Sequence, residues 1–320
     1  MLKPFCIPSL FGVVSVLTGT APAVLAQADA NEPSPVQDAG TAESRQSTVF
    51  TLSGSATYLG EADVDDDSGE VSVFRAGGRL GFRHSASQQL TVVGSISEEW
   101  SDYDFENAAN LFPGSTSTES PFGSLHETVF TLGFDYRIDE SWAAFGGGIA
   151  GFGYESGADF GDSFYAGGRA GFRYRYNDAL SLGFGAGVIS RLEEDTLIIP
   201  ILTVQWQIDE DWRLESDGLG AKLTWSASED LKLHGFARYS SRAYRTDENN
   251  SFLPGGAFVD SRFLLGAGAT WSPAERFTIS LEAGTSILQT FKFYNDSGNE
   301  ISERDSDPQL MLRAGIEFRY

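Results

Sequence analysis

Residues 310–320 have the sequence LMLRAGIEFRY, in which apolar and polar positions alternate. The even-numbered positions are all apolar, whereas the odd-numbered ones include Arg313, Glu317 and Arg319. A period of two predicts an extended strand, because successive side chains leave opposite faces of the pleat. An apolar face opposite a charged face is typical of a barrel strand whose outer side contacts lipid. A soluble β-sandwich could also end on such a strand, so the fold depends on the rest of the chain.

This strand resembles the C-terminal signal strand of bacterial outer-membrane barrels, which ends in an aromatic residue after alternating apolar positions. The resemblance implies a location in the bacterial outer membrane, with the lipid bilayer and lipopolysaccharide as surroundings. It also implies that the barrel-assembly machinery recognises Leu310–Tyr320.

The composition of the 320-residue chain excludes several classes of protein. The net charge is −23, glycine is abundant at 36 residues, and aromatic residues make up 13%. A disordered acidic protein would lack the aromatic residues, and a nucleic-acid-binding protein would be basic. After the N-terminal region no apolar run reaches about 18 residues, so no transmembrane helix is expected there. Barrel strands are shorter and alternate, so membrane residence stays open.

The N-terminal region predicts secretion. Residues 1–26 have the pattern of a signal peptide, with Lys3 near the start, an apolar stretch, and small residues before a cleavage point after Ala26. A buried N-terminal helix is the alternative, which three prolines disfavour. Cleavage would remove Cys6, the only cysteine, so the mature chain could form no disulfide. Residues 27–47, without apolar periodicity, predict a disordered periplasmic lead-in.

The remainder, residues 48–320, predicts an all-β fold: a transmembrane up-and-down antiparallel β-barrel of fourteen strands. The strands are expected over 48–60, 70–84, 88–103, 124–138, 140–154, 163–176, 179–192, 196–208, 211–217, 219–228, 230–244, 258–272, 275–290 and 306–320. Most are longer than the usual strand of ~5–6 residues and can cross a bilayer at a tilt. The hairpin at 211–228 is shorter than the others, so twelve strands are the alternative.

The connections between these strands alternate in length. Short turns follow one strand, and longer polar links at 61–69, 104–123, 155–162, 245–257 and 291–305 follow the next. Outer-membrane barrels have short periplasmic turns and long extracellular loops, so this alternation supports the barrel. Five tryptophans lie near the short turns, as expected of an aromatic girdle: Trp142, Trp206, Trp212, Trp225 and Trp271.

Three segments resemble an uncharacterised barrel family, the domain of unknown function DUF6268. They are the run from Ile199 to Leu214, the stretch Ala221–Trp225 and the stretch Phe236–Arg242. The resemblance covers roughly residues 50–320, with loose motifs. It implies an outer-membrane location and no known activity.

If the apolar parity faces lipid, the other parity lines the lumen, and it is rich in arginine. The expected lumen-lining residues are Arg75, Arg79, Arg83, Asp135, Arg137, Arg169, Arg173, Arg175, Arg238, Arg262, Glu282, Arg313 and Glu317. Such ladders can set a field across a pore or cross-brace a filled interior, and the sequence leaves both open. The predicted function is a passive pore or solute-binding channel for small anionic or zwitterionic solutes, below acidic extracellular loops. The alternative is a closed structural or adhesive barrel.

Neither a metal nor a cofactor is expected. The acidic run at 61–70 lacks the glycine and the bidentate glutamate of an EF-hand loop. A hydrolase at the barrel rim would need a histidine beside a nucleophile, and only His126, near Ser124 and Glu127, offers such a neighbourhood. An ordinary rim histidine explains this spacing, so the chain is predicted not to be an enzyme.

Overall fold

The computed structural model describes residues 47–113, 117–216 and 218–320. No helix in these ranges is long and apolar enough to span a membrane. The predicted signal peptide and the lead-in up to residue 46 lie outside the described residues.

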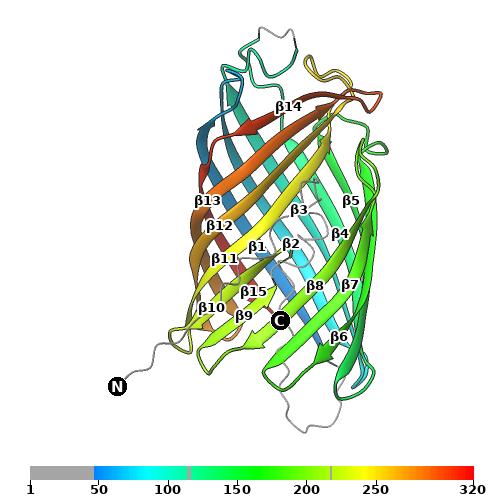
Figure 1. Ribbon diagram of the computed structural model, residues 1–320, viewed down its shortest axis with the longest axis vertical. Coiled ribbons are helices and arrows are strands. Elements are labelled where there is room, and N and C mark those ends of the chain that lie inside the picture. The colour runs from blue at the N-terminus through cyan, green and yellow to red at the C-terminus, as the bar shows by residue number, and fades with distance from the viewer. Residues whose placement is uncertain (1–46, 114–116, 217) are drawn as a thin grey trace, which may run out of the picture.

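The described chain forms one antiparallel sheet that closes into a tall barrel (Figure 1). Its strands are β1 (Ser47–Asp63), β2 (Glu70–Ser85), β3 (Leu90–Glu106), β4 (Leu125–Arg137), β5 (Trp142–Glu155), β6 (Phe164–Arg175), β7 (Leu180–Ile189), β8 (Leu197–Gln207), β9 (Trp212–Ser216), β10 (Gly220–Ser226), β11 (Leu231–Arg245), β12 (Ala257–Ala274), β13 (Phe277–Tyr294), β14 (Glu300–Ser306) and β15 (Gln309–Arg319). Strands adjacent in sequence pair from β1 to β13, and the pairing of β1 with β15 closes the barrel.

Two of these segments share one position in the wall, so the barrel has fourteen strands, as predicted. The end of β13 pairs with β14, and its beginning pairs with β15. The short break between β14 and β15 contains Pro308, which has no N–H to give to a ladder. The prediction of a loop over 291–305 was therefore wrong, because most of this polar stretch continues the β13–β14 hairpin beyond the apolar band.

Side chains alternate between the outside and the inside of the barrel. On β15, Leu310, Leu312 and Ile316 are 47–60% exposed, whereas Met311 between them is fully buried. Large apolar side chains are exposed in the same way on most strands, from Phe50 on β1 onward. A closed barrel with an apolar outer band is the structure of an outer-membrane protein, since closure leaves no unpaired edge in lipid.

The wall is incomplete above the short β9–β10 hairpin. Strand β8 pairs with β9 only at Gln205–Gln207, which leaves Leu197–Val204 without a strand on that side. Ile198 and Leu202 on this open edge are 72% and 80% exposed. Pro200 lies between them, which suits an edge, because proline cannot donate to a neighbouring strand.

The upper part of β11 leans inward across the barrel instead of pairing with β8. Arg245 at its end forms a bridge with Tyr154 on β5. The two backbones approach closely, since a Cβ on Gly153 would lie 1.9 Å from the carbonyl oxygen of Ala243. Glycine is required at this crossing, and the barrel narrows at its long-loop end as a result.

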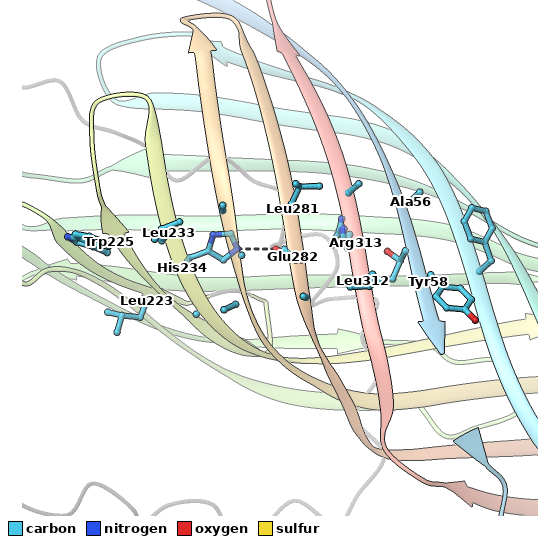
Figure 2. A pocket seen from close by; sticks show the side chains of 18 of the residues that line it. Ala56, Tyr58, Leu223, Trp225, Leu233, His234, Leu281, Glu282, Leu312 and Arg313 are labelled. Carbon is cyan, nitrogen blue, oxygen red and sulfur yellow. Dashed lines mark hydrogen bonds and ion pairs between the residues drawn. The ribbon is translucent and has the colours of Figure 1, made fainter. Parts of the chain in front are cut away.

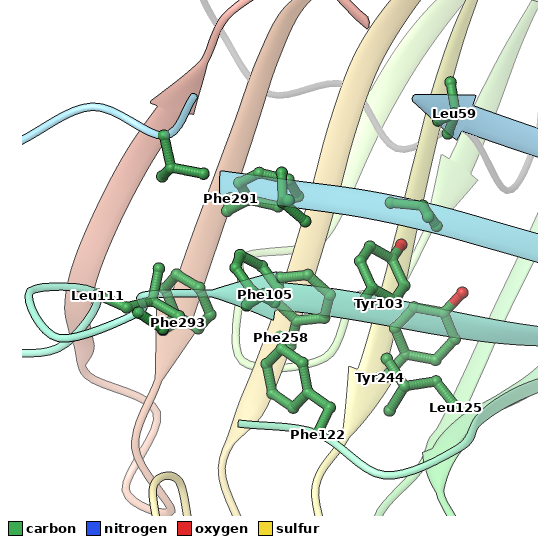
Figure 3. Close-up of a cluster of buried hydrophobic side chains, with 14 of the residues drawn as sticks. Leu59, Tyr103, Phe105, Leu111, Phe122, Leu125, Tyr244, Phe258, Phe291 and Phe293 are labelled. Carbon is green, nitrogen blue, oxygen red and sulfur yellow. The ribbon is translucent and has the colours of Figure 1, made fainter. Parts of the chain in front are cut away.

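The narrowed end is filled by an aromatic cluster that combines inward-facing strand residues with residues of the long loops (Figure 3). Tyr103 and Phe258 have ring centroids 5.0 Å apart, and Phe122, from the loop after β3, lies 4.5 Å from Phe258. Phe293 contacts Phe112 of the same loop at 4.9 Å. Rings at these separations pack as in a protein core. The upper lumen of the described structure is therefore closed by apolar side chains.

Candidate functional site

A layer of buried charged side chains lies directly beneath the aromatic cluster. Its centre is Asp260 on β12, which accepts hydrogen bonds at 2.6 Å from Arg75 Nη2 and from the Tyr103 hydroxyl. Arg262 pairs with the same carboxylate, and Gln289 Nε2 donates to its Oδ1 at 3.2 Å. Arg75 is 4% exposed, while Asp260 and Arg262 are 1% exposed. Two guanidinium groups thus share one buried acid, which is charge-assisted bonding inside the barrel.

A second pair in this layer joins β11 to β3 across the lumen. Both carboxylate oxygens of Glu99 accept from Arg242, at 2.5 Å to Nε and 3.1 Å to Nη2. Glu127 on β4 lies 4.0 Å from Arg242 and accepts a hydrogen bond from the Tyr165 hydroxyl at 2.8 Å. The layer therefore cross-braces opposite walls of the barrel at mid-height.

A third group occupies the inner faces of β11 and β13. Glu282 Oε2 lies 2.5 Å from Arg238 Nη2. The Oε1 atom of Glu282 lies 3.2 Å from His234 Nε2, and Figure 2 shows this contact. Closer to the short turns, Arg173 pairs with Asp135 at 2.6 Å, with the two side chains 25% and 32% exposed. This last pair is partly hydrated, unlike the pairs of the buried layer.

Exposure on the inner wall decreases from the short turns towards the long loops. On β2, Arg83 and Arg79 are partly exposed, Arg75 is buried, and Val73 beyond it is completely buried. The same gradient occurs on β4, from the partly exposed Asp135 to the buried Glu127. Solvent therefore enters the lumen from the short-turn end and stops at the charged layer.

The structure brings some of the predicted lumen residues together and separates others. Arg75 meets Arg262 at Asp260, Arg238 meets Glu282, and Arg173 meets Asp135. Arg79 and Arg169 also lie on inward positions of their strands, and each has an interaction partner. Four residues lie instead towards the short-turn end, namely Arg83, Arg137, Arg175 and Glu317. Arg175 Nε donates to the backbone oxygen of Glu140, and Glu317 pairs with Arg319. That this set lines a conducting lumen stays a prediction.

Sequence reasoning missed Asp260, Glu127 and the Tyr103 hydroxyl as members of the layer. Each lies near a long acidic loop, so the two acids resemble solvated loop residues in the sequence. The alternation of the strands could have identified the two acids as inward-facing. Asp260 is two positions from Arg262 and Glu127 is eight positions from Asp135, and an even separation in a strand places two side chains on the same face.

His126 lies on the outer rim with partners other than those expected. Its Nε2 is 3.2 Å from Ser156 Oγ and its Nδ1 is 3.4 Å from Glu98, whereas Glu127 points inward.

Within the described ranges, no group of three or more His, Cys, Asp or Glu side chains is arranged to hold a metal ion.

Comparisons with known proteins add a family and several distant structures. A family model described as "Domain of unknown function (DUF6268)" matches residues 123–319. No curated protein matches the chain. Among solved structures, an outer membrane channel from Pseudomonas putida F1 is 11% identical over 87% of this chain and 97% of its own, with a TM-score of 0.44. The Ralstonia pickettii toluene transporter TbuX is 9% identical over 87% and 90%, also with a TM-score of 0.44. Likeness at this level carries no argument about the function of the present chain.

Proposed function

This chain belongs to the DUF6268 family and folds as an outer-membrane β-barrel, and from this premise we propose that it is a passive channel for small anionic or zwitterionic solutes. The observation that carries the proposal is the excess of arginine on the inner wall. The thirteen predicted residues comprise ten arginines and three acids. With Arg242, Asp260, Glu99 and Glu127 included, the inner wall has eleven arginines and six acids in this set. A lumen with this excess concentrates anions, because its low-dielectric wall focuses the positive field.

The channel is closed in the structure described here. Water reaches the arginines from the periplasmic side, and the aromatic cluster seals the extracellular side. Phe112 and Phe122 of this cluster come from the loop between β3 and β4 rather than from the wall. We propose that movement of this loop opens the passage, since loop residues can leave without breaking a strand ladder.

A closed structural barrel is the second candidate function. It is favoured by the same sealed end and by the buried ion pairs, which could serve only to brace the walls. We propose no enzymatic role, with His126 as an ordinary rim histidine. Two predictions about the partners of the barrel remain predictions. They are that the barrel-assembly machinery recognises Leu310–Tyr320 and that the barrel contacts lipopolysaccharide.

Conductance in planar bilayers separates the two candidates. For the unaltered protein we expect small and rare openings. The double variant Phe112→Ala, Phe122→Ala should have an open probability at least about tenfold higher, since a loss of about 1.4 kcal/mol in the stability of the closed state shifts the equilibrium tenfold. Reversal potentials in a salt gradient should show preference for the anion. The matched control is Phe152→Ala, Phe160→Ala, which removes a stacked ring pair at the same end of the barrel but on its outer side.

The control should conduct like the unaltered protein. If neither the unaltered protein nor the loop variant conducts at moderate voltage, the channel proposal fails and the structural barrel remains. A liposome-swelling series with sugars, amino acids and organic acids then identifies the solutes that pass.

A further inference from the structure

Glu155, the last residue of β5, has a buried carboxylate whose partners come from two loops at the long-loop end of the barrel. From the loop between β3 and β4, the Gly123 N–H donates to Oε1 at 2.7 Å. From the loop between β11 and β12, the Asp247 N–H donates to Oε2 at 2.9 Å, and Asn250 Nδ2 donates to the same oxygen at 3.0 Å. Glu155 is 5% exposed, and within the described ranges it forms no ion pair. A buried carboxylate without a cation depends on its N–H donors, so both loops stabilise its charge.

In the first loop, these contacts restrain the chain on both sides of Phe122, whose ring packs in the aromatic cluster (Figure 3). The bond from the Gly123 N–H fixes the residue after Phe122. Asn250 Nδ2 also donates to the backbone oxygen of Pro121 at 2.8 Å, which fixes the residue before it. Because Glu155 holds Asn250 as well as Gly123, both restraints on Phe122 depend on one carboxylate.

In the second loop, Asn250 passes the same restraint on to two apolar residues. Its Oδ1 accepts from the backbone N–H groups of Phe252 and Leu253 at 2.9 and 2.8 Å. Leu253 is 2% exposed within the aromatic cluster, and the ring of Phe252 stacks on that of Phe112 with centroids 6.3 Å apart. Glu155 therefore also determines where the second loop adds apolar side chains to the seal.

The segment 121–123 has no other polar attachment to the described part of the chain. All of its hydrogen bonds there go to Glu155 or Asn250. The start of the same loop is held separately, since Ser302 Oγ on β14 donates to the backbone oxygen of Leu111 at 2.8 Å. Loss of the Glu155 contacts would therefore free Phe122 while the loop stays attached at its start.

The position of Glu155 between the loops couples their movements. With both loops in place, the carboxylate accepts charge-assisted hydrogen bonds from each of them. If one loop left alone, the carboxylate would lose part of its donors while the other loop still covered it, which is costly for a buried charge. If both loops left, water could solvate the carboxylate. The two states of low free energy are therefore both loops seated and both loops released.

We propose that Glu155 is a positioning residue that latches the segments 121–123 and 247–253 over the lumen, so that the two segments are seated and released together. The latch acts through Gly123, Asp247 and Asn250 and keeps Phe122 in the seal. This inference deepens the proposed channel function and rests on it for any effect on conduction. The coupled release of the two segments is a property of the loops and needs no conduction.

Hydrogen–deuterium exchange of the full chain in nanodiscs tests the latch. Glu155→Gln keeps the size of the side chain, removes its charge and turns one acceptor into a donor. Amide exchange in both segments should become at least about tenfold faster, because several hydrogen bonds to a charged group are weakened at once. The matched control is Glu119→Gln, which removes the charge of an exposed acid in the first loop and should exchange within about twofold of the unaltered protein.

Asn250→Asp is a second variant that acts on the same latch. It keeps the oxygen that accepts from Phe252 and Leu253 and replaces the donor with a carboxylate oxygen facing Glu155. Repulsion between the two acids should accelerate exchange in both segments by at least as much as Glu155→Gln. In planar bilayers, the open probability of both variants should be at least about tenfold higher than that of the unaltered protein.

Four results would overturn the latch. They are unchanged exchange in Glu155→Gln, faster exchange in only one of the two segments, an equal effect of Glu119→Gln, and equally faster exchange in the strands of the wall, which would show a general loosening of the barrel. If the unaltered protein conducts and Glu155→Gln leaves its open probability unchanged, the latch does not control the passage and the proposal is also wrong. Faster exchange confined to both segments, without conductance in any variant, would support the latch and contradict only the channel.

Discussion

Asp260→Ala is expected to destabilise the barrel by about 3–5 kcal/mol, the usual cost of removing one partner of a buried ion pair. The variant leaves Arg75 and Arg262 in a buried layer without their shared carboxylate. It also removes the acceptor of the Tyr103 hydroxyl, which lies 2.6 Å from Asp260 Oδ2. Equilibrium unfolding in urea, followed by tryptophan fluorescence in lipid vesicles, measures the change.

The matched control for Asp260→Ala is Asp135→Ala, which breaks the ion pair with Arg173. That pair has the same 2.6 Å separation, but its side chains are 25% and 32% exposed. Water can replace the lost carboxylate there, so the expected cost is at most about 1 kcal/mol. Equal costs for the two variants would show that the layer around Asp260 is hydrated and that the lumen is open at this level.

Phe258→Ala is expected to cost about 3–5 kcal/mol, because Phe258 is fully buried at the centre of the aromatic cluster. Its ring contacts Tyr103, Phe122 and Phe293 at centroid separations of 4.5–5.3 Å. The loss would leave a cavity that loop and strand residues on several sides can fill only partly. The same unfolding measurement applies, with conductance recorded on the same preparation.

Phe263→Ala on the same strand is the matched control for Phe258→Ala. Phe263 is 39% exposed on the outer side, where lipid chains fill the vacated space. We expect a cost of about 1 kcal/mol and unchanged conductance. If Phe263→Ala destabilises the protein as much as Phe258→Ala, the cluster is not a packed core and the upper lumen is not sealed by it.

The sequence predicts the two faces of the wall well, because the period of two is a local property. Leu310 and Leu312 point outward and Arg313 inward as the alternation requires. Arg75 and Arg262 were recognised as inward-facing for the same reason. Asp260, the acid that both arginines share, was not recognised as inward-facing. It is 185 positions from Arg75 along the chain, and only the closure of the barrel brings the two residues together.

Closure of the lumen could not be predicted from the alternation. The seal depends on Phe112 and Phe122, which belong to a loop without periodicity, and on the inward lean of β11 over Gly153. The strand character of residues 300–306 was missed because polar side chains occupy both parities and Ile301 is the one apolar residue among them. A strand outside the lipid band needs no apolar face, so the signal that identifies membrane strands is absent there.

Reactivity of single cysteines along β2 tests the central claim, that inward positions contact water only below the charged layer and outward positions contact lipid. The variants are Arg83→Cys, Arg79→Cys, Val73→Cys and Leu80→Cys, each with Cys6 replaced by serine. In proteoliposomes treated with a membrane-impermeant thiol reagent, the first two should react, whereas Val73→Cys in the seal and Leu80→Cys in lipid should not. Rapid labelling of Val73→Cys would contradict a closed lumen, and rapid labelling of Leu80→Cys would contradict the assignment of the faces.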